Sequence, residues 1–380
     1  MNKFKITYVF LGNRIEKLND QKSIAKEFFY SYLDFKQTHE DTQIIEFTNT
    51  TITTKITYYL NKLDIILRKV TQLPFFSARI SIKKNLDTIY KTQNLIMVGD
   101  RVAVSLIFPL LYIKYFKKNL VSSVFVMGLF SNKPINKIKK PFHNLFLNLL
   151  LKSLSKLIFL GEGEFNFASK EYPKYSHKFY FLPFSIDTDF WQPRNNFDKN
   201  ERDYILFIGN DGNRDYEKVL KIAQKLPQFR FKVITQRIGE NSKLPTNVEL
   251  INGSWSYRQV TDKSLKKVYE QAKLTIIPLK ESLQPSGQSV TLQSMAMNTP
   301  VIISDTVGFW DDKKFISNKH LIRLKENSVE SWTTEIFKLY NNSEKLENLS
   351  LDGHKLINED YNLKVFHKKL IEILELDKKN

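Results

Sequence analysis

The chain has 380 residues, a hydrophobic fraction of 42% and no Cys. This length favours two or three domains, and the apolar fraction suffices for globular cores, which excludes disorder as the default state. The lack of thiols excludes disulfides, a Cys-ligated zinc site and a thiol nucleophile. The net charge of +18 is uneven: residues 1–195 carry 29 Lys and Arg against 15 Asp and Glu, whereas residues 196–380 carry 29 against 25.

The first half begins with MNKFKITYVFLGNR, which runs directly into apolar residues and has no small-residue cleavage site. This pattern predicts a first strand and not a signal peptide. The longest apolar stretches, such as Val102–Ile113, fall short of the roughly 18–20 residues that span a bilayer. We therefore expect a protein that is soluble or peripherally attached. The predicted strands of this half are Phe4–Leu11, Asn94–Val98, Val121–Met127, Lys156–Leu160 and Phe179–Pro183.

The second half alternates strands and helices more clearly. Its predicted strands are Tyr204–Ile208, Phe231–Thr235, Val248–Leu250, Leu274–Pro278 and Val301–Ser304. Its predicted helices are Tyr216–Lys225, Asp262–Gln271, Gln288–Met297 and Ser331–Leu339. Such alternation is typical of parallel α/β sheets.

A polar, irregular stretch at Gln192–Glu201 separates the two halves. It predicts two Rossmann-like domains, at residues 1–195 and 196–380, facing each other across a cleft. Because open α/β sheets bind ligands beyond the carboxyl ends of their strands, this arrangement suits a reaction between two substrates.

The most informative segment runs from Leu279 to Ser304, LKESLQPSGQSVTLQSMAMNTPVIIS. A loop containing Ser286 and Gly287 precedes the predicted helix, and Gly287 allows close approach of a ligand to the backbone. The first turn of that helix offers unpaired N–H groups that favour a phosphate, and Gln288 and Ser289 add side-chain donors. The alternative is a well-capped helix of an ordinary α/β domain, which spacing alone does not distinguish.

This segment resembles the donor-binding signature of GT-B glycosyltransferases, especially glycosyltransferase family 4, whose helix ends in a Met-Ala-x-Gly-x-Pro-Val-Ile turn. Two further stretches are similar to the same family. LPFSIDTDFW at 182–191 is similar to its interdomain segment, and LFIGNDGNRD at 206–215 to the start of its family 1-like donor domain. The resemblance covers about residues 180–375 and implies a GT-B fold with an acceptor-side domain followed by a nucleotide-sugar donor domain.

Three features, which involve four residues, depart from the family pattern. Gln293 replaces the Glu that holds the donor ribose, Asn298 replaces a Gly, and Asn210 with Arg214 replaces an Arg and Lys pair. The resemblance implies that Arg214 is catalytic and that Gln293 faces the ribose. The donor-binding residues that it implies are Asn210, Arg214, Ser286, Gly287, Gln288, Ser289 and Gln293. Without the resemblance, Arg214 reads as a loop residue paired with Asp211 or Asp215.

The acceptor side is less distinctive. Gly12, Arg14 and Gly128 follow predicted strands of the first half and are candidate acceptor-side residues. Many family members carry a His after the middle strand, whereas this chain reads VMGLF at 126–130. Ordinary turn chemistry is the alternative for all three residues.

No metal site or organic cofactor is expected. Asp187 and Asp189 form an Asp-x-Asp motif, but its context favours local hydrogen bonding. The six His residues have no pair at metal-ligand helical spacing, and neither a Walker A loop nor a Gly-x-Gly-x-x-Gly fingerprint occurs.

The resemblance implies a hexosyltransferase-like, retaining glycosyltransferase that moves a sugar from a nucleoside diphosphate donor to a glycan or lipid-linked acceptor in surface polysaccharide biosynthesis. Two alternatives remain open: a sugar-nucleotide epimerase of the same fold, and a non-catalytic GT-B-like binding protein. A nucleic-acid partner is not expected, because no aromatic–basic recognition motif accompanies the basic charge.

From Arg101 to Gly161 the sequence has ten basic residues and no acidic one. Within this run, Lys137–Lys156 combines Lys with Phe142, Phe146 and many Leu, as interfacial helices do. We therefore expect a cytoplasmic protein that attaches peripherally to the anionic inner face of the plasma membrane. The alternative is that Leu145–Leu151 is a core helix whose lysines are solvated.

Overall fold

The computed structural model describes residues 5–19, 24–47, 54–116, 119–131, 136–195, 198, 201–239, 241–253 and 260–376. The chain forms two compact units. Unit 1 comprises Met1–Asp20, Phe28–Leu182 and His367–Asn380, and unit 2 comprises Gln21–Glu27 and Pro183–Phe366. Residues 183–195, which precede the boundary expected from the sequence, thus belong to unit 2, as does a short segment from near the N-terminus.

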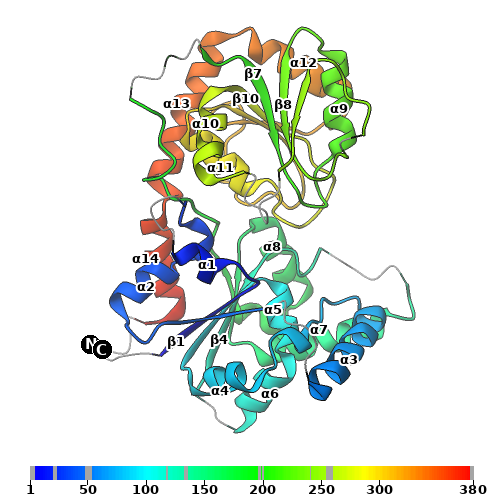
Figure 1. The fold of residues 1–380 in the computed structure, drawn as a ribbon, viewed down its shortest axis with the longest axis vertical. Helices are drawn as coiled ribbons and strands as arrows, with labels where there is room; N and C mark the ends of the chain where they lie inside the picture. The colour runs from blue at the N-terminus through cyan, green and yellow to red at the C-terminus, as the bar shows by residue number, and fades with distance from the viewer. Residues whose placement is uncertain are drawn as a thin grey trace. The chain divides into compact units, whose positions relative to one another are not determined.

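Unit 1 is built on a six-stranded sheet in the order β2-β1-β3-β4-β5-β6, with every neighbouring pair parallel (Figure 1). Its strands are β1 (Ile6–Phe10), β2 (Gln43–Glu46), β3 (Asn94–Val98), β4 (Val121–Val126), β5 (Lys156–Phe159) and β6 (Phe179–Phe181). Its helices are α1 (Arg14–Leu18), α2 (Tyr32–Thr38), α3 (Lys55–Thr71), α4 (Lys83–Lys91), α5 (Asp100–Ser105), α6 (Ile107–Phe116), α7 (Lys140–Ser153) and α8 (Glu162–Glu171), and α14 (Leu363–Leu374) lies mostly in this unit.

Both faces of this sheet are covered, which explains why its central strands are almost entirely buried and mostly apolar. Successive side chains of a strand point to opposite faces. In β1, Val9 joins a core with α5, α6 and α7, whereas Tyr8 packs on Tyr32 and Phe35 of α2.

Unit 2 repeats this plan with the strand order β12-β11-β10-β7-β8-β9, again all parallel. Its strands are β7 (Tyr204–Ile208), β8 (Arg230–Ile234), β9 (Val248–Ile251), β10 (Ala272–Ile277), β11 (Val301–Ser304) and β12 (Ile322–Leu324). Its helices are α9 (Tyr216–Lys225), α10 (Asp262–Gln271), α11 (Gln288–Ala296), α12 (Val329–Tyr340) and α13 (Ser343–Asp360).

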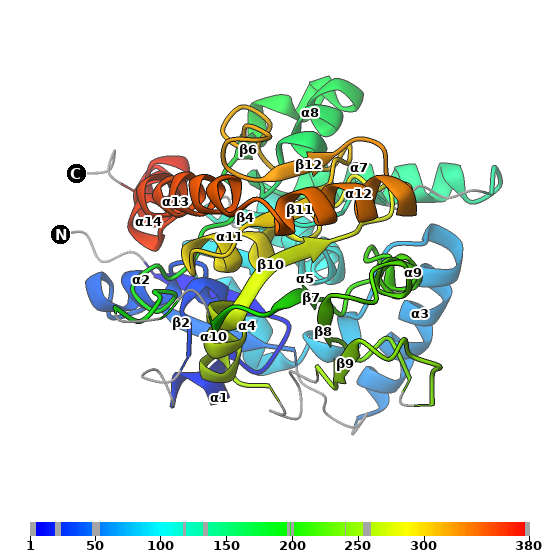
Figure 2. The same ribbon diagram turned by 90° about the horizontal axis from the view of Figure 1, so that it is seen from above.

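The helices of unit 2 also lie on both faces of its sheet. Phe207 of β7 belongs to a core with α9 and α12, and α11 and α9 lie on opposite sides of β10, β7 and β8 (Figure 2). On the α11 side, Ser294 donates a hydrogen bond of 2.7 Å to Thr275 of β10. The architecture is therefore α/β with two Rossmann-like parallel sheets, as the sequence predicts.

Within the described part of the chain, no helix combines the length and the apolar character that crossing a membrane requires.

Candidate functional site

The strand order of each sheet fixes where a ligand-binding crevice lies. In unit 2 the chain passes from β7 to β8 on one side, while β10 pairs with β7 on the other. Ligands of open α/β sheets bind beyond the carboxyl ends of the two strands at such a switch point. The loops at that position, 209–215 after β7 and 278–287 after β10, hold most of the donor residues expected from the sequence.

Arg214 reaches this point because its loop pairs with the segment after β10. Arg214 forms an isolated antiparallel bridge with Leu279, flanked by a hydrogen bond of 2.8 Å from the Lys280 N–H to the Asn213 carbonyl. Its side chain lies across Gly209, where an added Cβ would stand 2.7 Å from the Arg214 Cγ and Nε. Gly209 is therefore what allows the guanidinium to lie along the end of β7.

The Arg214 side chain is only 3% exposed and forms an ion pair with Asp211, but its hydrogen bonding is incomplete. Nε donates a long hydrogen bond of 3.4 Å to the Ile208 carbonyl. Nη1 lies 3.0 Å from Asp211 Oδ2, but its N–H bonds do not point at that oxygen, so Nη1 has no hydrogen-bond partner. A buried guanidinium nitrogen without an acceptor is a site ready to bind an anion.

The N-terminus of α11 lies beside this guanidinium. Gly287 caps the helix with a left-handed φ of 85° and, having no side chain, makes no side-chain cap hydrogen bond. A Cβ on Gly287 would lie 3.6 Å from Arg214 Nη1. The positive end of the helix dipole and the first-turn amides of α11 thus lie close to the guanidinium.

The remaining residues of the two loops hold this arrangement together. Asn213, which the sequence reasoning did not single out, donates to Gln284 at 3.0 Å and to the Ser286 hydroxyl at 2.8 Å. Asn210 instead donates to the Gly253 carbonyl at 2.7 Å and accepts from the Gln236 N–H at 2.7 Å. Asn210 thus binds the backbone of Gln236 and Gly253, and its expected contact with the nucleotide-sugar donor stays a prediction.

Ser286 and Gln288 are buried, and Ser289 is half-buried in the first turn of α11. The structure therefore places Ser286, Gly287, Gln288 and Ser289 together next to Arg214, while their contact with a donor stays a prediction.

Gln293 lies farther along α11 and is 6% exposed. Its Oε1 accepts a hydrogen bond of 3.0 Å from the Tyr269 hydroxyl, and its Nε2 donates one of 2.8 Å to Glu27 Oε1. The Trp191 indole donates to the same Glu27 oxygen at 2.8 Å. Burial raises the pKa of Glu27 to about 7 against the opposing effect of these hydrogen bonds. Both ends of the Gln293 amide thus have partners within unit 2.

In the Asp-x-Asp motif, Asp187 accepts hydrogen bonds from backbone amides, one of them local. Asp187 accepts from the Phe190 N–H at 3.3 Å and from the Lys26 N–H at 3.2 Å. In the described part of the chain, no three His, Asp or Glu side chains gather as metal ligands would.

On unit 1, the switch point lies between β1 and β3. Gly12, Gly99 and Gly128 follow the adjacent strands β1, β3 and β4, each with positive φ. The Arg14 side chain already has a hydrogen-bond partner within unit 1, because its Nε donates to the Phe28 carbonyl at 3.0 Å. The structure thus brings Gly12 and Gly128 to the same edge of the sheet, and their contact with an acceptor stays a prediction.

Two carboxyl groups lie at this edge: Glu164, which follows a strand predicted from the sequence, and Asp100, which the sequence did not indicate. Glu164 accepts from the Gly128 and Phe130 amides, both at 2.9 Å, and Asp100 accepts from the Met127 amide at 3.3 Å. Burial, and for Glu164 the nearby Asp100 charge, raises the pKa of both carboxyls above the usual range. The GEGE sequence at 161–164 predicts a loop after a strand, where the structure begins α8, and nothing local indicates that Glu164 contacts the loop after β4.

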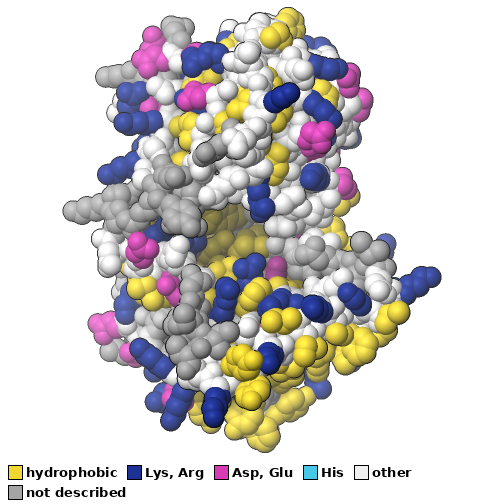
Figure 3. Space-filling view, turned by 45° about the vertical axis from the view of Figure 1, so that its right-hand side comes forward, with side chains coloured by type: hydrophobic (Ala, Val, Ile, Leu, Met, Phe, Trp, Pro, Cys, Tyr) yellow, Lys and Arg dark blue, Asp and Glu magenta, His cyan; other side chains and the backbone are white. Residues whose placement is uncertain are grey.

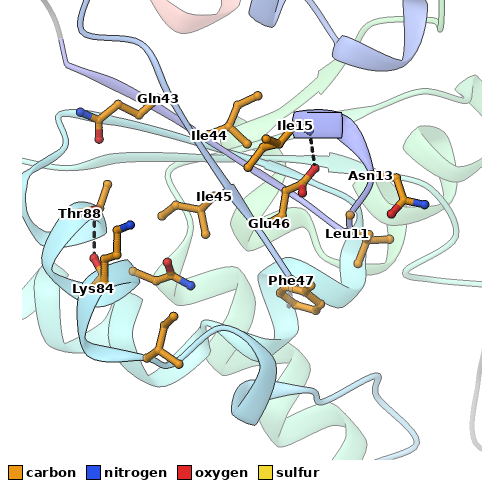
Figure 4. Close-up of a pocket in the computed structure, with 13 residues that line it drawn as sticks. Leu11, Asn13, Ile15, Gln43, Ile44, Ile45, Glu46, Phe47, Lys84 and Thr88 are labelled. Carbon is orange, nitrogen blue, oxygen red and sulfur yellow. Dashed lines mark hydrogen bonds between the residues drawn. The ribbon is translucent and has the colours of Figure 1, made fainter. Parts of the chain in front are cut away.

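A cavity of about 1050 Å³ lies along the outer edge of β2, where Gly12 joins apolar side chains such as Ile15, Ile45 and Phe47 (Figure 4). Lys84 and Thr88 of α4 form its opposite wall. Of the expected acceptor-side residues, Gly12 lines this cavity.

The chain matches no protein-family profile and no curated protein at the sequence level. Among solved structures it resembles HepE from Anabaena, with a TM-score of 0.65, 9% identity, and 97% of this chain and 99% of that chain covered. It resembles a glycosyltransferase from Rickettsia africae, with a TM-score of 0.65, 12% identity and 100% of both chains covered. It also resembles sucrose-phosphate synthase from Thermosynechococcus elongatus, with a TM-score of 0.69, 11% identity and 98% of both chains covered. These likenesses show that the chain has the GT-B fold.

Proposed function

We propose that this chain is a glycosyltransferase that binds a nucleoside diphosphate sugar on unit 2 and transfers the sugar to an acceptor bound on unit 1. The observation that carries the proposal is Arg214. Its Nη1 is buried without a hydrogen-bond acceptor, next to the N-terminus of α11, where Gly287 makes no side-chain cap, at the switch point of a Rossmann-like sheet.

A diphosphate fits this arrangement in charge and in hydrogen bonding. The planar guanidinium presents parallel donors to two phosphate oxygens, and the helix amides supply further donors. When the bond between the sugar and the diphosphate breaks, negative charge grows on the leaving group. Arg214 and the first turn of α11 would stabilise that charge, which is the electrostatic part of catalysis.

The structural relatives agree with a nucleotide-sugar donor. HepE is described in complex with UDP-glucose, and TarM from S. aureus, with a TM-score of 0.57 and 13% identity, in complex with UDP and α-GlcNAc-glycerol. For this chain, the base, the hexose and a retaining outcome remain parts of the proposal. We propose that the positive charges come from Arg214 and α11, so that the reaction needs no metal ion.

For the acceptor, we propose a glycan or a lipid-linked glycan of a surface polysaccharide, reached by a cytoplasmic enzyme attached to the inner face of the plasma membrane. The basic run 101–161 supports attachment to anionic lipid. In the structure, Lys137, Lys139 and Lys140 precede or open α7 and are half-buried or exposed, whereas Leu147 and Leu150 belong to the core of unit 1. The alternative interpretation, that Leu145–Leu151 is a core helix, therefore applies to the side of α7 that contacts the core of unit 1. Lys117, Lys118 and Lys133 lie outside the described residues.

The proposed reaction is tested by a thermal-shift screen of UDP-, GDP-, ADP- and TDP-sugars, followed by chromatography of the products. A donor that binds the folded state raises its melting temperature by an amount that grows with the logarithm of the ratio of donor concentration to dissociation constant. We expect one nucleotide class to stabilise the chain and to release its nucleoside diphosphate in the presence of an acceptor extract. A modified sugar nucleotide formed without acceptor would indicate an epimerase, and no response to any nucleotide would indicate a non-catalytic protein.

A further inference from the structure

Helix α3 of unit 1 turns polar side chains toward the protein. Asp64 is 2% exposed and accepts a hydrogen bond of 3.0 Å from the Ala78 N–H. Arg68 donates to the Phe75 carbonyl, and the buried Thr71 donates to the Leu67 carbonyl at 2.6 Å. A surface helix in water normally shows the reverse pattern, with polar residues facing outward.

The outward side of α3 is instead apolar. Ile56, Tyr59, Leu63 and Ile66 follow one another at spacings of three and four residues, so they share one face of the helix. They are 70%, 66%, 45% and 57% exposed, respectively. Large apolar side chains exposed singly need no explanation, but a row of four on one helix marks an interaction surface.

The same face is positively charged. Lys55, Lys62 and Lys69 recur at seven-residue intervals beside the apolar row, and all three are exposed. The single acidic residue of the helix, Asp64, is the one that points inward. The exposed side of α3 therefore carries cations and apolar groups together, with no carboxylate among its own residues.

A second group of exposed apolar side chains lies on α6, which is joined to α3 through α7. α3 packs on α7, and α7 packs on α6, whose Tyr112, Tyr115 and Phe116 are more than half exposed. At the lower right of Figure 3, hydrophobic side chains gather with Lys and Arg among them at this part of unit 1. We call the exposed residues of α3 and α6 named above the α3–α6 face.

We propose that the α3–α6 face docks on an anionic lipid bilayer, with Ile56, Tyr59 and Ile66 entering the interface and the lysines of α3 contacting lipid phosphates. Interfacial helices combine these two kinds of residue. A second copy of the chain fits less well, because pairing this face with itself would place Lys opposite Lys. The inference rests on the membrane attachment in the proposed function and assigns it chiefly to α3, which lies outside the basic run 101–161.

The test is co-sedimentation of the full chain with vesicles of phosphatidylcholine alone or mixed with phosphatidylglycerol. We expect binding to the anionic vesicles that falls with added salt. The combined Ile56→Ser, Tyr59→Ser and Ile66→Ser change should weaken it on the order of tenfold or more, since each residue contributes apolar burial. Lys55→Glu, Lys62→Glu and Lys69→Glu together should abolish the preference for anionic lipid.

Two control variants carry changes of the same kind at exposed positions of unit 2. The first replaces three apolar residues, Ile316→Ser, Phe337→Ser and Leu351→Ser, and the second replaces three lysines, Lys267→Glu, Lys319→Glu and Lys338→Glu. These should leave vesicle binding unchanged. All four Trp residues lie beyond residue 190, so Tyr59→Trp adds a reporter to α3, and brominated lipid should quench its additional fluorescence.

Equal binding of the α3 variants and the wild type, or a Tyr59→Trp reporter that brominated lipid does not quench, would overturn the proposal. Loss of a dimer in the α3 variants, seen by light scattering without any vesicle binding by the wild type, would assign the face to a second copy instead. Nucleotide binding is measured on the same samples. It distinguishes failure of the membrane proposal from failure of the proposed enzyme function, because only the latter predicts loss of nucleotide binding.

Discussion

The side-chain amide of Gln293 donates a 2.8 Å hydrogen bond to Glu27, a residue 266 positions earlier in the chain. The same amide accepts from the Tyr269 hydroxyl at 3.0 Å, and the Trp191 indole also donates to Glu27. The segment that carries Glu27 thereby becomes part of unit 2, joined to α10, α11 and the segment after Leu182 by one buried hydrogen-bond network.

Gln293→Leu is expected to destabilise the protein by about 1–3 kcal/mol, because it leaves the Tyr269 hydroxyl without its acceptor and Glu27 with one donor fewer. Urea denaturation of the variant and the wild type measures this difference. Gln224→Leu, at an exposed position of α9, is the control and should change the free energy of unfolding by no more than about 0.5 kcal/mol. A stable Gln293→Leu variant with an increased KM for the donor would favour the ribose contact expected from the sequence.

Glu27 also predicts a dependence of stability on pH. Burial raises the pKa of Glu27 from 4.5 to about 7, with Asp262 adding a smaller repulsion. Between about pH 4.5 and about pH 7, the Glu27 carboxyl is therefore protonated in the folded state and ionised in the unfolded chain. The stabilisation is complete below about pH 4.5 and is lost as the pH rises through about 7.

Glu27→Gln keeps an oxygen acceptor for Gln293 and Trp191 but removes this titration. Its free energy of unfolding should fall less between about pH 5 and about pH 8 than that of the wild type, measured by denaturant titrations at each pH. Glu344→Gln, an exposed change on α13, should keep the wild-type dependence. Parallel curves for Glu27→Gln and the wild type would show that Glu27 does not titrate in this range.

Gly287→Ala is expected to disturb the N-terminus of α11. The added methyl group would lie 3.0 Å from Ile277 Cγ2 and 3.2 Å from Ile303 Cδ1, at a φ of 85° that L residues rarely adopt. The left-handed conformation alone costs about 1–2 kcal/mol, so melting temperature and nucleotide affinity should both fall. Gly212→Ala is the matched control from the same region, because its Cβ would meet no atom within 4 Å. Equal effects of the two changes would contradict the role assigned to Gly287.

Removal of divalent metal should leave donor turnover unchanged, because the proposed positive charges are Arg214 and the amides of α11. Turnover before and after treatment with EDTA, with Mg²⁺ and Mn²⁺ added back, measures this. A loss on chelation that either ion restores would require a metal ion on the diphosphate.

The strands of both sheets that are five or more residues long could be predicted from the sequence, because strands buried on both faces are nearly continuous apolar runs. Gln43–Glu46 and Ile322–Leu324 could not, since each contains only two apolar residues, which form no recognisable pattern. The resemblance to the GT-B donor signature indicates Gly287 and Arg214, whereas the residues alone leave both as ordinary cap or loop residues. The sequence could not reveal that Glu27 contacts Gln293, or that Asn213 links Gln284 to Ser286, since these contacts depend on tertiary packing.

The most direct test of the central claim is calorimetric titration of UDP, GDP, ADP and TDP into the wild type, Arg214→Ala and Arg202→Ala. Arg202 lies at the other end of α11, where it donates to the Met297 and Asn298 carbonyls, so it controls for loss of a partly buried arginine. A hydrogen bond to a charged group contributes about 1.5–3 kcal/mol. The account predicts that one nucleotide binds the wild type and Arg202→Ala alike, and binds folded Arg214→Ala about tenfold or more weakly. Equal affinity for all three proteins, or no binding of any nucleotide to the wild type, would contradict it.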